Sequence, residues 1–315
     1  MPTDPLVVRF EVTEALPADV TLGEPAWITA RVFAPTSPRP GRQSVLACVH
    51  GGSYDWRYYH LQIPGRAGYS MAEDMAARGH VVIAIDQLGV GESARPAAPG
   101  NATRQAAAAA GHSAMSQAFA RLRDGTLHPA VPPCSDALTV GVGHSMGGMT
   151  LVTQQARFET CDLVAVLGWS NFGAHIEIGG KLVLSDIPYD PAGPGYKTLD
   201  RGRVMRSFHW DTTPANVLAA DAALSVAYPA RLGWEAQQAC TPEDAGRIRT
   251  PVFLAMGERD VSPDPYAEPA FYAGSDDVTF FRLEQSAHCH NFAPTRGLLW
   301  SRLDRWITSL ADAAG

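Results

Sequence analysis

Short apolar segments recur along this chain, and segments with helical periodicity separate them. Ser44–His50 and His80–Asp86 are apolar almost throughout, which suits strands that are covered on both faces. We predict similar strands at 137–142, 163–169, 251–256 and 278–283. We expect helices at 70–78, 105–122 and 147–158, and a final helix marked by Leu299, Leu303, Trp306 and Leu310. This alternation predicts an α/β fold with a doubly wound, mostly parallel sheet.

The alternation is interrupted once, between the predicted strand that ends at Trp169 and the one that begins at Pro251. A crossover between parallel strands needs only about 20 to 25 residues, and residues 170–250 far exceed that length. We therefore expect a core domain made of residues 1–170 and 248–315, with a cap at 171–247 inserted after the sixth core strand. The first two of those strands, Leu6–Val12 and Ala26–Phe33, are predicted as antiparallel edge strands.

Charge and cysteine content indicate the partners and the compartment. The 315-residue chain has a formal net charge of -7 and no basic block, so we expect neither nucleic-acid binding nor docking on an anionic membrane. The five cysteines are scattered without a CxxC pair, as is typical of free thiols in a reducing compartment. The opening residues show no signal-peptide pattern. We predict a cytoplasmic protein whose partner is a small-molecule substrate, and the sequence leaves its oligomeric state open.

One predicted strand-to-helix junction carries the sequence Gly143-His144-Ser145-Met146-Gly147. A G-x-S-x-G turn at such a junction strains the serine backbone and exposes its hydroxyl at the carboxyl edge of the sheet. The first N–H groups of the following helix point at the same place. Because the chain has 29 glycines, the pentapeptide alone could arise by chance. The strand before it and the helix after it favour Ser145 as a nucleophile.

Four landmarks occur in an order that makes the chain resemble the α/β-hydrolase superfamily outside the predicted cap. They are His50-Gly51-Gly52-Ser53 after the third strand, the loop from Asp86 to Ser93 after the fourth, Ser145 after the fifth, and an Asp and then a His after the last two. The resemblance implies an α/β-hydrolase fold and a Ser–His–Asp triad that needs no cofactor and no metal. Haloalkane and epoxide hydrolysis in this superfamily use Asp at the elbow, so the serine argues against both.

The resemblance also implies the acid of the triad. Asp260 lies in a loop after the predicted strand 251–256, where the family places its carboxylate. The proline that the family carries in this loop comes one residue early here, at Pro263. Asp260 would orient the base and stabilise its protonated form, and a solvated loop carboxylate is the alternative.

The base is expected after the last strand, where two histidines compete. The family places its base just after two small residues, and Ser286-Ala287 precede His288, so the pattern favours His288 over His290. With Cys289 between them, these histidines also suggest a metal site. We disfavour it because ligands so close in sequence cannot easily all face one ion.

The glycines of His50-Gly51-Gly52-Ser53 indicate an oxyanion hole. A tetrahedral intermediate needs two fixed N–H donors, and glycines let the backbone approach the substrate. We assign one donor to Met146 and the other to Gly52 or Ser53, and an ordinary turn at the end of a strand is the alternative.

The nature of the substrate follows less directly from the sequence. The aromatic residues of the predicted cap suggest a substrate with an apolar or aromatic part, and a carboxylic ester or a lactone is the first expectation. An acyltransferase or cyclase, a C–C bond hydrolase and a non-catalytic binding protein on the same fold are the alternatives. Tyr54 and its neighbours Trp56, Tyr58 and Tyr59 would either line an acyl pocket or pin their loop to the core. The candidate substrate-binding residues are Tyr54, His144, Trp169, His209 and Trp210.

Overall fold

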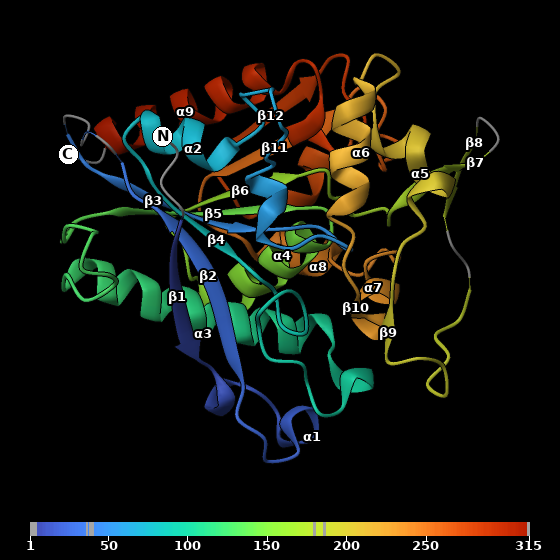
Figure 1. The fold of residues 1–315 in the computed structure, drawn as a ribbon, viewed down its shortest axis with the longest axis horizontal. Coiled ribbons are helices and arrows are strands. Elements are labelled where there is room, and N and C mark those ends of the chain that lie inside the picture. The colour runs from blue at the N-terminus through green and yellow to red at the C-terminus, as the bar shows by residue number, and fades with distance from the viewer. Residues whose placement is uncertain (1–4, 36, 38–40, 179–180, 185–186, 314–315) are drawn as a thin grey trace.

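The computed structural model describes residues 5–35, 37, 41–178, 181–184 and 187–313. Within these residues eight strands form one sheet in the order β1-β2-β4-β3-β5-β6-β11-β12 (Figure 1). Their bounds are β1 Leu6–Glu11, β2 Trp27–Phe33, β3 Ser44–Val49, β4 Val81–Ile85, β5 Leu138–His144, β6 Leu163–Leu167, β11 Val252–Gly257 and β12 Val278–Leu283.

The pairing directions confirm the predicted fold class. From β4 to β12 every neighbouring pair is parallel, whereas β1 pairs antiparallel with β2 and β2 pairs antiparallel with β4. The prediction of two edge strands is right for β1 and wrong for β2. The second strand hydrogen-bonds on both sides, and most of its side chains are buried, because it joins β1 to the parallel part of the sheet.

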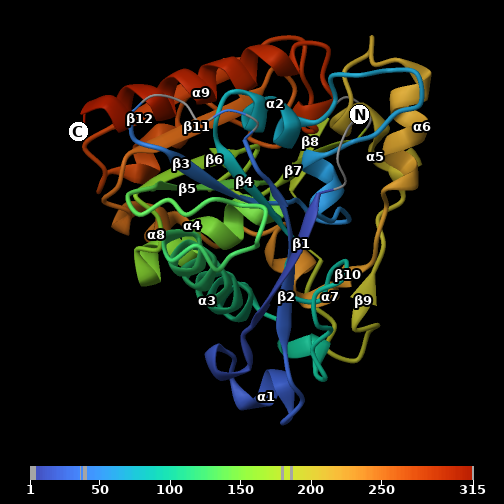
Figure 2. The ribbon, with the colours of Figure 1, turned by 60° about the vertical axis from the view of Figure 1, so that its left-hand side comes forward.

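Helices cover both faces of the sheet, as continuously apolar strands require (Figures 1 and 2). One face carries α2 (Met71–Ala77) and α9 (Arg296–Ala313), and the other carries α3 (Arg104–Arg123), α4 (Met146–Phe158) and α8 (Pro242–Arg247). The N-cap side chains of α2 and α3 accept hydrogen bonds from N–H groups of the first helical turn, which have no acceptor within the helix. The Ser70 hydroxyl accepts from the Glu73 N–H at 3.0 Å, and the Thr103 hydroxyl accepts from the Ala106 N–H at 3.3 Å.

The two faces of the central strands pack into two separate apolar cores. In β4, Ile83 and Ile85 join the cluster under α3 and α4, whereas Val82 and Ala84 join the cluster under α2 and α9. This alternation follows from the two-residue period of a strand. It explains why these segments lack the polar positions of a half-exposed strand.

The chain between β6 and β11 forms small elements beyond the carboxyl ends of the parallel strands (Figure 1). They are β7 His175–Ile178, β8 Lys181–Leu184, β9 Tyr196–Lys197, α5 Arg201–Phe208, α6 Ala215–Ala223, β10 Tyr228–Pro229 and α7 Ala230–Glu235. β7 pairs with β8, and β9 pairs with β10, outside the main sheet. The following helix, α8, lies inside the predicted cap boundaries of 171–247 but packs on α4 beside the sheet.

In the described part of the chain, no helix combines the length and the apolar character that crossing a bilayer requires.

Two neighbouring leucines of α9 allow a matched test of the core under this helix. Leu299 is 0% exposed and Leu298 is 60% exposed. We expect Leu299→Ala to lower the free energy of unfolding by about 2 to 5 kcal/mol, because it leaves a cavity in the core. Leu298→Ala should change it by less than about 0.5 kcal/mol. Urea denaturation of both variants measures this, and equal effects would contradict the packing described.

Candidate active site

The turn between β5 and α4 consists of Ser145 alone, with φ 54° and ψ -120°. This conformation is strained for a residue with a side chain. Parallel neighbours help to hold it, because the Ser145 N–H donates to the carbonyl of Leu167 at 2.9 Å. A Cβ on Gly143 would lie 2.6 Å from the Gly147 carbonyl oxygen, and one on Gly147 would lie 2.2 Å from the Val49 carbonyl oxygen. Both glycines are therefore required by backbone contacts.

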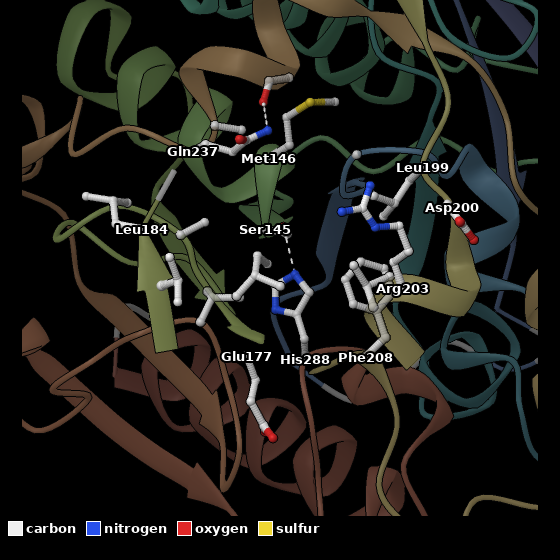
Figure 3. Close-up of a pocket in the computed structure, with 18 of the residues that line it drawn as sticks. Ser145, Met146, Glu177, Leu184, Leu199, Asp200, Arg203, Phe208, Gln237 and His288 are labelled. Atoms are coloured by element: carbon white, nitrogen blue, oxygen red, sulfur yellow. Dashed lines mark hydrogen bonds between the residues drawn. The ribbon is translucent and has the colours of Figure 1, made fainter. Parts of the chain in front are cut away.

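The Ser145 hydroxyl faces a histidine from the loop after β12. The Nε2 of His288 lies 2.8 Å from Ser145 Oγ (Figure 3). Its Nδ1 lies 2.7 Å from Asp260 Oδ1. A carboxylate can only accept, so Nδ1 carries the ring proton and Nε2 presents a lone pair to the serine. The structure thus brings the three predicted triad residues together, and the histidine that contacts the serine is His288.

Asp260 is buried and accepts hydrogen bonds on both oxygens. Oδ1 receives the Val261 N–H at 2.8 Å in addition to His288, and Oδ2 receives the Gly257 N–H at 2.7 Å and His290 Nε2 at 2.7 Å. Burial alone would raise the pKa of this carboxyl. Electrostatic interaction and hydrogen bonds with His290 and His288 outweigh burial and hold the pKa of Asp260 well below its usual range. Asp260 is therefore ionised at neutral pH.

The residues predicted to supply the oxyanion donors have different surroundings. Gly52 and Met146 line the cavity above Ser145, whereas Ser53 is fully buried with φ 63°. The Ser53 carbonyl accepts from Arg201 Nη2 at 3.2 Å and from the Val226 N–H at 3.1 Å. Met146 is the first residue of α4, so its N–H has no acceptor within the helix. Of the two residues predicted to supply the second donor, Gly52 lines the described part of the cavity and Ser53 does not.

A cavity of about 1060 Å³ opens above Ser145 and His288 (Figure 3). Much of its wall is apolar and comes from the segment between β6 and β11, including Ile176, Val183, Leu184, Leu199, Val204 and Phe208. The exposed Asp200, Arg203 and Arg206 give it a charged rim. The floor therefore carries the polar groups, and the walls suit an apolar ligand.

The helix α5 also binds the loop of His288 through its backbone. The His288 N–H donates to the Ser207 carbonyl at 3.0 Å, and the Cys289 N–H donates to the Phe208 carbonyl at 2.9 Å. The loop of Asp260 is tied to the same segment, because Arg259 Nη2 donates to the His209 carbonyl at 2.8 Å. The segment that walls the cavity thus also fixes the loops of His288 and Asp260.

None of the five candidate substrate-binding residues lines the described part of the cavity. Tyr54 is buried and donates through its hydroxyl to Asp221 Oδ1 at 2.6 Å, and His209 Nε2 donates to the other oxygen of Asp221 at 2.9 Å. Both rings lie where the loop that contains Gly52 and Ser53 meets the segment that contains α5 and α6. Of the two roles considered for the tyrosines near residue 54, pinning the loop is the one that fits their burial.

The other three candidates also have structural partners. His144 Nε2 donates to the carbonyl of His288 at 2.8 Å, and burial, followed by the charges of the nearby histidines, holds the pKa of His144 well below its usual value. Trp169 is buried, and its Nε1 donates to Thr241 Oγ1 at 2.8 Å. The Arg259 guanidinium lies 4.8 Å from the centroid of the Trp210 ring. His144 and Trp169 thus each use a ring nitrogen within the protein, Trp210 packs its ring against Arg259, and none of the three lines the described part of the cavity.

Among the described residues, no cluster of three or more His, Cys, Asp or Glu side chains has a geometry that could hold a metal ion. His288 and His290 both face Asp260, whereas Cys289 Sγ lies 3.1 Å from the Tyr54 hydroxyl. All five cysteines are free thiols.

The apolar wall that β7 and β8 contribute was not predicted from the sequence. These strands pair antiparallel, from His175 opposite Leu184 to Ile178 opposite Lys181. The sequence contained a signal, because Gly179-Gly180 separates two short segments rich in aliphatic residues, which is typical of a hairpin. The contact of His290 with the second oxygen of Asp260 was not predicted either.

A strained serine at the carboxyl end of a parallel sheet, hydrogen-bonded to a histidine and through it to a carboxylate, defines the class of α/β hydrolases. The chain belongs to the alpha/beta hydrolase family, whose model matches residues 46–299. A comparison with curated proteins found no match.

Similar solved structures cover nearly the whole chain at low identity, and at such identity they show the fold alone. A soluble variant of monoglyceride lipase from Saccharomyces cerevisiae, in complex with a substrate analog, has a TM-score of 0.68 at 11% identity over 97% of this chain and 96% of that chain. A thermophilic esterase from Thermogutta terrifontis has a TM-score of 0.60 at 14% identity, with 97% and 99% covered. Est1E from Butyrivibrio proteoclasticus, with ferulic acid bound, has a TM-score of 0.54 at 14% identity, with 90% and 95% covered.

The contact at Gly147 leads to a stability prediction. Gly147→Ala would place a methyl group against the carbonyl oxygens of Val49 and His50, neither of which is the end of a flexible side chain. We expect a loss of at least about 3 kcal/mol in the free energy of unfolding, or failure to fold. Gly297→Ala is the control, because its Cβ meets nothing within 4 Å and the position lies in α9, where alanine is favoured. Thermal unfolding measures both, and a stable Gly147→Ala would contradict the close approach.

Proposed function

We propose that the protein is a serine hydrolase that cleaves a carboxylic ester or a lactone with an apolar or aromatic part through an acyl-enzyme intermediate. The observation that carries this proposal is the chain of contacts from Ser145 Oγ to His288 Nε2 at 2.8 Å and from His288 Nδ1 to Asp260 Oδ1 at 2.7 Å. In this proposal Ser145 is the nucleophile, His288 the general base and acid, and Asp260 the group that orients the histidine.

The reaction would proceed in two halves. Ser145 Oγ attacks the carbonyl carbon while its proton moves to His288 Nε2. The bond between the acyl carbon and the leaving oxygen then breaks, and the alcohol departs with the proton from His288. Water attacks the acyl-enzyme with the same histidine as base, which releases the carboxylic acid and restores the serine. A lactone follows the same steps with its own hydroxyl as the leaving group.

The negative oxygen of each tetrahedral intermediate requires donors that are already in place. We assign this role to the N–H groups of Met146 and Gly52, since both residues line the cavity beside Ser145. The amino end of α4 adds a favourable dipole at the same point. Ser53 supports the loop from behind, where Arg201 holds its carbonyl.

The shape and lining of the cavity support the substrate class. Its volume of about 1060 Å³ exceeds what a small acyl group such as acetate needs, and aliphatic side chains dominate the wall near the nucleophile. The similar structures named as a monoglyceride lipase and an esterase support an ester as the bond that is cleaved.

The reactivity of Ser145 tests the proposed function directly. A fluorophosphonate reacts with an activated serine, so we expect one adduct per chain on the wild type by intact-mass spectrometry. Ser145→Ala should gain none, and His288→Ala should react at least about a hundredfold more slowly, because the serine loses its base. Ser113→Ala is the matched control, since Ser113 also follows a Gly-His pair but lies in α3, and it should label like the wild type. An unlabelled wild type would defeat the proposed function.

A substitution in the apolar wall of the cavity tests the proposed substrate class. Leu184→Trp adds bulk at the cavity, so we expect kcat/KM for esters of long acyl chains to fall by about tenfold or more, with little change for acetate esters. Leu182→Trp serves as the control, because Leu182 lies on the same strand, is exposed, and does not line the described part of the cavity. Steady-state kinetics over a series of p-nitrophenyl esters tests this. An equal loss of kcat/KM on short and long esters would mean that this wall does not hold the acyl chain of the substrate.

A further inference from the structure

One buried contact at the site has no role in the reaction steps proposed above. Asp260 lies between two histidines, His288 Nδ1 at 2.7 Å from Oδ1 and His290 Nε2 at 2.7 Å from Oδ2. His290 is 0% exposed, and Asp260 is buried with it. Because a carboxylate only accepts, His290 Nε2 must carry a proton and donate it.

We propose that His290 is a positioning residue of the triad: its N–H takes up part of the Asp260 charge and so sets the pH above which His288 is free to act as the base. This inference rests on the proposed function, because it assumes that His288 activates Ser145. It gives the four groups a linear order, Ser145, His288, Asp260 and His290.

The backbone already holds Asp260 in place without His290. The Val261 N–H binds Oδ1 at 2.8 Å, and the Gly257 N–H binds Oδ2 at 2.7 Å, one donor on each oxygen. These two amides fix the plane of the carboxylate and aim Oδ1 at His288. What His290 adds is a further N–H on a buried anion, where a hydrogen bond to a charged group is strong.

That extra donor acts on the base through the carboxylate. The more of the Asp260 charge is shared with His290, the less remains to stabilise the protonated form of His288. His288 then gives up its proton at lower pH and is available over a wider range. The same donor helps to hold the pKa of Asp260 well below its usual range, together with His288 and against the effect of burial.

The other titratable groups around His290 are engaged with other residues, so Asp260 is the group that accepts its hydrogen bond. The ring of His144, from the end of β5, lies 5.5 Å from that of His290 in an edge-on arrangement, and its Nε2 is used by the His288 carbonyl. Cys289, on the same loop, contacts the Tyr54 hydroxyl. Tyr58, from the segment Trp56–Tyr59, stacks on His144 at 4.4 Å. In the part of the chain that the structure describes, Nδ1 of His290 has no hydrogen-bond partner.

The test is the pH dependence of the rate at which a fluorophosphonate labels Ser145 in the full-length protein. In His290→Leu the donor is lost while the two backbone amides remain, so we expect the midpoint of the acid limb to move up by roughly half to one pH unit. In His290→Gln the side-chain N–H can occupy the place of Nε2, so the midpoint should stay near that of the wild type. His290→Asn is too short to reach Oδ2 and should behave like His290→Leu, which keeps the test open if the leucine variant does not fold.

His80→Leu provides the control for a merely structural loss. His80 is also fully buried and its Nε2 lies 3.0 Å from Asp304, but it precedes β4 at the amino ends of the parallel strands, far from Ser145. This variant should lose stability and keep the wild-type midpoint. If His290→Leu and His290→Asn label with an unchanged or lower midpoint, the role of His290 is overturned and the proposed function stands. A wild type that is not labelled at any pH would instead refute the proposed function itself.

Discussion

The parallel pairing of β3, β5, β6, β11 and β12 is the constraint on which the rest of the site depends. Parallel strands end at the same edge of a sheet, so the loops that follow four of these strands meet above it. Those loops carry Gly52, Ser145, Asp260 and His288, which are far apart in the sequence. At Gly147 the backbone of α4 comes so close to Val49 that no side chain fits between them. The strained serine is thus held by the same packing that joins β3 to β5.

Sequence reasoning succeeded for the core because the signals there are local. A continuously apolar strand such as Val81–Ile85 has one stable environment, between two layers of helices, and the structure confirms it. The elbow around Ser145 was recognisable because strain and crowding require glycine at fixed places. The preference for His288 over His290 rested on two small residues before it, and the distances agree with that preference.

The walls of the cavity were not predicted from the sequence, because an aromatic side chain can either face a substrate or pack inside the protein. Its identity alone does not distinguish these two uses. Tyr54 and Trp169 were expected to face the substrate, but each buries its ring and satisfies its polar end with Asp221 or Thr241. A buried Tyr or Trp needs such a partner, and pairings between distant segments are not visible in the sequence. Much of the wall consists instead of aliphatic residues such as Ile176, Leu184 and Val204, which lie on short elements that carry no motif.

The backbone contacts between α5 and the loop of His288 bear on how this enzyme class could be redesigned. The carbonyls of Ser207 and Phe208 accept from His288 and Cys289, and Arg201 holds the carbonyl of Ser53. A chimera that exchanges the whole segment between β6 and β11 would therefore remove backbone supports of His288 and of the loop that contains Gly52 and Ser53, along with the wall of the cavity. The strand β7 is tied to the same supports, because the His175 N–H donates to the Val261 carbonyl at 2.9 Å and the Glu177 N–H donates to the Ser207 hydroxyl at 3.1 Å. Single side chains of the wall, such as Val183 and Leu184 on β8, are therefore the smaller unit for changing selectivity around an intact site.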